Sequence, residues 1–64
     1  MKEVYDIIIG KLERDRLKFV SEMLDLVEDI DYNDMKRAAY YKAQGKSNYC
    51  MDLIEFFEEV RDNL

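Results

Sequence analysis

The sequence has no histidine, proline or tryptophan, one cysteine and two glycines among its 64 residues. Without histidine there is no imidazole to act as a general base, to activate a nucleophile or to bind a metal ion. Gly10 and Gly45 stand alone, so there is no glycine-rich phosphate-binding loop. The single cysteine, Cys50, suits a reducing compartment, which predicts a cytoplasmic location. The longest apolar run, residues 7–9, is too short to cross a membrane.

The remaining groups that could carry chemistry have structural interpretations. Cys50 falls on the apolar side of a predicted helix, where burial blunts the reactivity of a thiol. Residues 29–33 resemble the start of a calcium-binding loop, but Asp34 and Tyr40 stand where glycine and glutamate are required. Arg16 lies in the middle of an apolar face, and either extends to water or pairs with a carboxylate of another helix. We therefore predict no enzyme activity, catalytic residue, cofactor or metal.

Helix propensity is high almost throughout, and we expect one all-α domain over residues 1–64. Apolar residues recur every three or four positions and predict a first helix over residues 3–30. The members of this apolar face are Tyr5, Ile8, Ile9, Leu12, Phe19, Val20, Met23, Leu26, Val27 and Ile30. An acidic turn follows, in which Asp31 or Asn33 is suited to cap a second helix, with Asp34 in its first turn.

A helical segment over residues 33–63 would match the first helix in length, which is typical of an antiparallel helical hairpin. Gly45 is the uncertain point. It either ends a helix, with Ser47 or Asn48 capping a third one, or lies inside a continuous helix close to the first. We expect a hairpin whose second arm is kinked or broken near Gly45. The last segment has a one-sided apolar stripe made of Tyr49, Cys50, Leu53, Ile54, Phe56, Phe57, Val60 and Leu64.

The two arms carry more apolar surface than a single contact between two helices can cover. Val4, Ile7, Leu17 and Leu24 lie outside the main face of the first helix. Short chains often bury such a surplus by association. The sequence therefore predicts a homodimer that forms a four-helix bundle.

The net charge of −5 is distributed in blocks. Residues 22–31 contain five acids and no base, residues 36–46 four bases and no acid, and residues 52–62 five acids against Arg61. We take as candidate partner-binding residues the acids that recur at helical spacing and two tyrosines of the basic block. They are Asp52, Glu55, Glu59 and Asp62, then Glu22, Asp25 and Asp29, and Tyr40 and Tyr41. If the helix phase continues, both tyrosines are expected to lie away from the main apolar side.

Residues 4–13 (VYDIIIGKLE) and 49–57 (YCMDLIEFF) resemble small, acidic helical proteins encoded by phages and prophages of low-GC Gram-positive bacteria. The resemblance implies an accessory protein in a bacterial host cell. Some proteins of this class bind and inhibit host enzymes or defence systems such as CRISPR effectors.

Taken together, these observations predict a protein–protein interaction module, acting as an inhibitor of a host or defence protein. Two alternatives remain open. One is a structural role as a homodimeric bundle or assembly component. The other is nucleic-acid mimicry by the acidic stripes, or weak nucleic-acid binding by the basic block; its four bases in a chain of net charge −5 make nucleic acid the less favoured partner.

Overall fold

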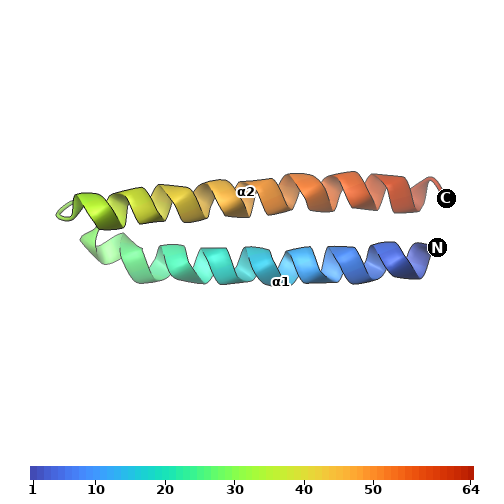
Figure 1. The fold of residues 1–64 in the computed structure, drawn as a ribbon, viewed down its shortest axis with the longest axis horizontal. Helices are drawn as coiled ribbons and strands as arrows, with labels where there is room; N and C mark the ends of the chain where they lie inside the picture. The colour runs from blue at the N-terminus through green and yellow to red at the C-terminus, as the bar shows by residue number, and fades with distance from the viewer.

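The computed structural model describes residues 1–64, apart from the side chain of Asp29. Two long helices, α1 (Lys2–Leu26) and α2 (Asp34–Asp62), run antiparallel and are joined by a 3-10 turn, η1 (Val27–Asp29), and a short loop. Both termini lie at one end of the molecule and the turn at the other (Figure 1). The Cα atoms span 49 × 14 × 12 Å. The predicted all-α helical hairpin is confirmed.

The turn between the helices is fixed by Asn33, one of the two caps expected from the sequence. Its side-chain oxygen accepts hydrogen bonds from the backbone N–H groups of Met35, at 3.0 Å, and Lys36, at 3.1 Å. The Arg37 side chain donates to the backbone carbonyl of Ile30 at 3.0 Å and to that of Asp31 at 3.3 Å. One cap and one guanidinium thus tie the loop to the start of α2.

The first helix ends earlier than the predicted residue 30, because α1 gives way to η1 at Val27. The last turn of α1 contains no basic residue. Acidic side chains there are unfavourable beside the negative end of the helix dipole. Tightening into a 3-10 turn brings the chain round to α2 within a few residues.

The expected kink or break at Gly45 is wrong, since α2 continues from Asp34 to Asp62 without interruption. Gly45 has no positive φ, and a Cβ atom placed on it would meet nothing within 4 Å. It therefore neither ends a helix nor allows a close approach to α1. Ser47, considered as a cap for a third helix, is instead buried between α1 and α2.

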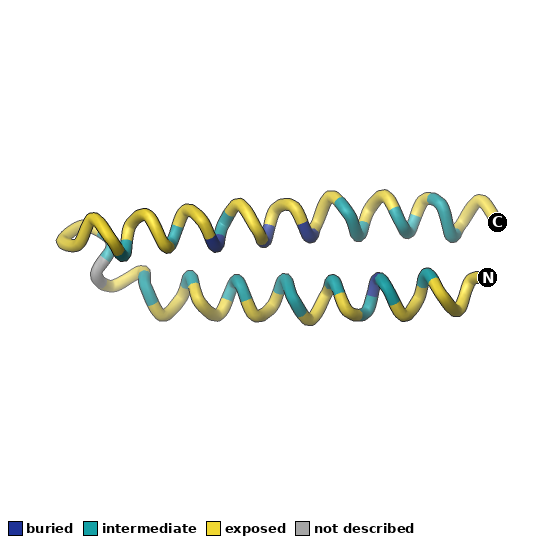
Figure 2. Tube along the Cα trace, viewed as in Figure 1, coloured by how far each residue is buried: buried dark blue, intermediate teal, exposed yellow. Residues whose placement is uncertain are grey.

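The two helices meet along one continuous line of residues, which we call the seam. Spacings of four and three residues alternate along it without a break, as in coiled coils. In α1 and the turn the seam comprises Tyr5, Ile9, Leu12, Arg16, Phe19, Met23, Leu26 and Ile30. In α2 it comprises Lys36, Tyr40, Ala43, Ser47, Cys50, Ile54, Phe57 and Arg61. Each is buried or half-buried, and Figure 2 shows these bands on the facing sides of the helices.

Large residues of α1 lie opposite small ones in the middle of α2. The buried residues among those described are Ile9, Ala43, Ser47 and Cys50. The predicted burial of Cys50 is confirmed. By contrast, Tyr49, Phe56 and Leu64 of the predicted apolar stripe are exposed, because one neighbouring helix covers only a narrow strip of α2.

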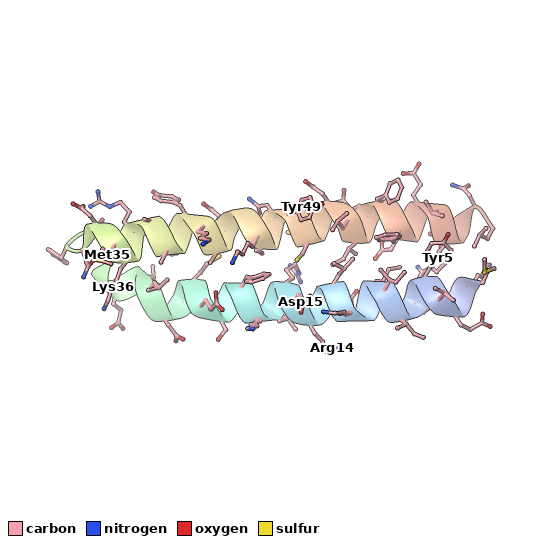
Figure 3. All side chains as sticks on the ribbon, in the orientation of Figure 1. Tyr5, Arg14, Asp15, Met35, Lys36 and Tyr49 are labelled. Carbon is pink, nitrogen blue, oxygen red and sulfur yellow. The ribbon has the colours of Figure 1, made fainter. Side chains whose placement is uncertain are left out.

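Three contacts between side chains fix the register of the helices. The rings of Tyr5 and Phe57 lie 6.1 Å apart near the termini, where Figure 3 labels Tyr5. The Lys46 ammonium lies 5.4 Å from the centre of the Phe19 ring, a cation–π distance. Arg61 pairs with Asp6 at 2.8 Å, and hydrogen bonds to Asp6 and Asp62 raise the pKa of Arg61 above its ordinary value.

The hairpin exposes more surface than is usual for its mass. Its accessible area is 5022 Å². A folded protein of 7.7 kDa is expected to expose about 4,300 Å². The excess of about 700 Å² is close to the roughly 800 Å² that each partner buries in a standard protein–protein interface.

Candidate functional site

The acidic residues predicted in α2 form an exposed stripe along that helix, and Asp52 and Glu59 lie on its side away from α1. Asp52, Glu55, Glu59 and Asp62 are all exposed. Asp62 accepts a hydrogen bond from the Nε of Arg61 at 3.3 Å. The seam determines which side of α2 faces α1. Asp52 and Glu59 lie about half a helical turn away from the seam residues, so their side chains are on the opposite side of the helix.

The acidic residues predicted in α1 do not join this stripe. Glu22 and Asp25 are exposed, but they lie near the turn, whereas residues 52–62 lie near the termini. The side chain of Asp29 lies outside the described residues. The antiparallel arrangement therefore separates the two acidic blocks to opposite ends of the molecule.

The basic block does not form one surface. Tyr40 is half-buried on the seam, contrary to its expected position away from the apolar side, and Tyr41 is exposed. Their rings are perpendicular, with centres 5.6 Å apart. Arg37 holds the turn and also pairs with Asp34 at 3.6 Å, while Lys46 lies over Phe19. Two of the four bases thus stabilise the hairpin itself.

A groove opens beside the seam in the middle of the hairpin. It has a volume of about 350 Å³ and is lined by Glu13, Arg16, Leu17, Met51, Ile54, Glu55 and Glu58. Arg16 is half-buried and forms no ion pair with any carboxylate in the described part of the chain. Of the two expectations for Arg16, the structure shows its extension beside the groove rather than a pair across the helices.

Apolar residues that border the seam, some exposed and some half-buried, fall on two opposite sides of the hairpin. Four of them each follow a seam residue of α1 by one position, which places them on the same side as the groove. They are Leu17, Val20, Leu24 and Val27. We call this side, with the groove residues, the groove flank.

A second set precedes the seam residues and lies on the other side, which we call the aromatic flank. Its large apolar residues are Val4, Ile8, Met35, Tyr49, Leu53, Phe56 and Val60. Tyr49 and Phe56 are 65% and 57% exposed. The sequence placed Val4 outside the main apolar face, but it placed Ile8 and the four residues from 49 to 60 on the same faces as the seam residues. The three- and four-residue spacing of each set contains the signal that separates them.

Tyr49 and Phe56 lie directly beside the acidic stripe. On a helix, residues three and four positions apart are neighbours. Asp52 therefore lies between the two aromatic side chains, and Glu59 follows Phe56 by one turn. We call Tyr49, Asp52, Phe56 and Glu59 the outer α2 patch.

The described residues include no group of three or more His, Cys, Asp and Glu side chains placed to hold a metal ion. In the same residues, neither helix has a stretch apolar enough to cross a bilayer. Compared with known proteins, the chain matches no family model, no curated relative and no solved structure.

Proposed function

We propose that this chain is a small, non-enzymatic protein–protein interaction module. The observation that carries the proposal is the outer α2 patch, in which two exposed aromatic side chains lie beside two exposed carboxylates. Tyrosine and phenylalanine are enriched at the centres of protein interfaces, and charged residues form their rims. The sequence supports the absence of catalysis, because it contains no histidine and its one thiol is buried.

The charge and the apolar side chains of the outer α2 patch indicate what kind of partner surface would fit it. Asp52 and Glu59 border the aromatic side chains on one side, and Glu55 and Asp62 extend this negative charge around α2. A matching surface would present an apolar pocket for Phe56, bordered by lysine or arginine. Such complementary charge raises the association rate and disfavours acidic partners. The resemblance to phage and prophage proteins adds that the partner is a host or defence factor, which the module would inhibit by occupying a basic surface.

The proposal is tested by capture with the tagged protein from lysate of the source cells. We expect Phe56→Ser and the double variant Asp52→Lys/Glu59→Lys to recover much less of the principal co-purifying protein. Ile7→Ser and Glu28→Lys are matched controls, because they change an exposed apolar and an exposed acidic residue elsewhere. Equal recovery by all five proteins would contradict a role for the patch. Circular dichroism establishes that each variant remains helical.

A second candidate function is a structural one, as a homodimeric four-helix bundle. The observation that favours it is the excess accessible area of the single hairpin, about 700 Å² above the expectation for its mass. Docking a second copy would remove about that much surface from water. The two functions are compatible, because the outer α2 patch lies away from the groove flank.

Sedimentation equilibrium over a wide range of protein concentrations tests the homodimer. We expect a mass of twice 7.7 kDa at micromolar concentration. A mass of one chain at every concentration would contradict it. For the nucleic-acid alternative, an electrophoretic shift that persists at physiological salt would support binding, since nonspecific contacts to phosphates weaken steeply with salt.

A further inference from the structure

The groove flank has the shape and composition of a surface that another helix covers. Its apolar residues extend from the groove toward the turn along α1, where Leu24 is 68% exposed and Leu17 60% exposed. Next to them, α2 contributes Met51 in the groove and Tyr41 nearer the turn, both exposed. The apolar strip thus extends from the middle of the hairpin toward the turn.

The charges of the groove flank are unequal at its two ends. Glu13, Glu55 and Glu58 line the groove on the side nearer the termini. Arg37, Gln44 and Asn48 each follow a seam residue of α2 by one position and so lie on the groove flank. Arg37 is nearest the turn, and Gln44 and Asn48 are uncharged. The flank is therefore acidic at the end with the three glutamates, where Arg16 is the one base lining the groove, and close to neutral at the other, where Arg37 pairs with Asp34 at 3.6 Å.

We propose that the groove flank is the contact between two copies of this chain, docked antiparallel about a two-fold axis that passes near Asn48 and between Leu17 and Val20. This inference rests on the proposed homodimer and specifies its interface. Each helix would then pack against its own counterpart, α1 on α1 and α2 on α2, to give a four-helix bundle in which all neighbours are antiparallel.

Charge decides the orientation. If two copies docked with the same ends together, the three glutamates of one groove would face those of the other, which is unfavourable. Antiparallel docking moves the glutamates toward the turn of the second copy. Counting equal distances from the axis places Glu55 opposite Tyr41 and Glu58 close to Arg37 along α2. Along α1 it places Glu13 opposite Leu24.

Position along the hairpin decides between the two flanks. Apart from Met35 near the turn, the large apolar residues of the aromatic flank lie between the middle of the hairpin and the termini. A symmetric contact centred on them would overlap only part of each hairpin. At mid-length that flank carries Lys18 and Lys46, whereas the groove flank carries Leu17 and Val20. A two-fold axis at the middle of the groove flank lets the full 49 Å length of both copies overlap. That overlap is what burying roughly 800 Å² per chain requires.

The first test of the interface compares aspartate substitutions at two apolar residues of similar exposure, one on the groove flank and one on neither flank. Leu24→Asp should raise the dimer dissociation constant by about two orders of magnitude, because it places a charge in the apolar strip. Ile7→Asp is the control, since Ile7 is 71% exposed and lies on neither flank. Both variants should remain helical, because neither side chain is buried in the single chain. A Leu24→Asp protein that dimerises as tightly as wild type would overturn the interface.

Disulfide trapping provides the second test and reports orientation. In a Cys50→Ala background, Asn48→Cys places a thiol beside the proposed two-fold axis, and Lys18→Cys places one at the same height on the opposite flank. Oxidation should link the Asn48→Cys chains rapidly and leave the Lys18→Cys chains unlinked.

The outcomes separate this inference from the homodimer itself. Linkage through Lys18→Cys, or through neither position in a protein that sediments as a dimer, would overturn the groove-flank interface and leave the homodimer standing. Wild-type protein that sediments as a single chain at every concentration would overturn both, and the groove flank would then have a different occupant.

Discussion

At the scale of single residues, Asn33 is the side chain that caps the start of α2. It satisfies two backbone donors at the start of α2 and is itself exposed, so removing it costs the cap and little packing. We expect Asn33→Ala to lower the free energy of unfolding by about 1 kcal/mol. Asn33→Asp is the control and should retain most of the stability, because its carboxylate accepts the same bonds. Urea denaturation at fixed protein concentration measures both, and an equal loss in the two variants would contradict capping.

Gly45 allows a direct test of the continuous α2. Glycine inside a helix is less favourable than alanine by about 1 kcal/mol. A Cβ atom at this position meets nothing within 4 Å. We therefore expect Gly45→Ala to raise the free energy of unfolding by about that amount. A decrease would mean that Gly45 adopts a left-handed conformation at a helix end, as in the three-helix alternative. Thermal and urea unfolding followed by circular dichroism distinguish the two.

The sequence predicted residue environments best where a single physical rule decides them. The capping preference narrowed the helix start to Asp31 or Asn33, of which Asn33 is the cap. The apolar neighbours of Cys50 were sufficient to place it among the buried residues. Tyr40 was misplaced because the apolar pattern weakens at Ala43 and Ser47. Small residues bury without marking a helix face by hydrophobicity, so the phase of the first half of α2 could not be followed from that pattern alone.

At the scale of the helices, the seam packs large residues of α1 against small ones of α2. Ala43 is only 3% exposed, so a larger side chain there must push the helices apart. We expect Ala43→Leu to lower the free energy of unfolding by about 1–3 kcal/mol. Ala38→Leu is the matched control, because Ala38 is exposed on the same helix. If both substitutions had the same effect on urea unfolding, α2 would not contact α1 at Ala43.

The sequence was sufficient to predict that two long helices form and that they pair as a hairpin. It predicted only in part where the helices end and which side of α2 faces α1. High propensity and the lack of proline leave the acidic turn as the one place to reverse direction, which fixes a hairpin with arms of equal length. Gly45 was misjudged because glycine marks a helix end only when the backbone there turns left-handed. That conformation depends on tertiary packing, and Gly45 faces open space instead.

At the scale of the whole molecule, the candidate acids could be identified from the sequence but their grouping could not. Residues 22–29 and 52–62 look equivalent as runs of charge. Chain reversal at the turn places them at opposite ends, and the stripe in α2 has Tyr49 and Phe56 as exposed aromatic neighbours. The separation of the aromatic and groove flanks depends on the seam, which is a property of both helices together.

The overall dimensions of the assembly follow from how two hairpins dock. One hairpin has a Cα radius of gyration of 14.7 Å. Side-by-side docking at a helix spacing of about 10 Å raises this only to about 16 Å, because thickness is added and length is not. Docking end to end would instead bring it to about 29 Å. We therefore expect small-angle X-ray scattering to show twice the mass of one chain with almost the same maximum dimension. Leu24→Asp should halve the mass and leave that dimension nearly unchanged, whereas a dimer of nearly double length would contradict docking through the groove flank.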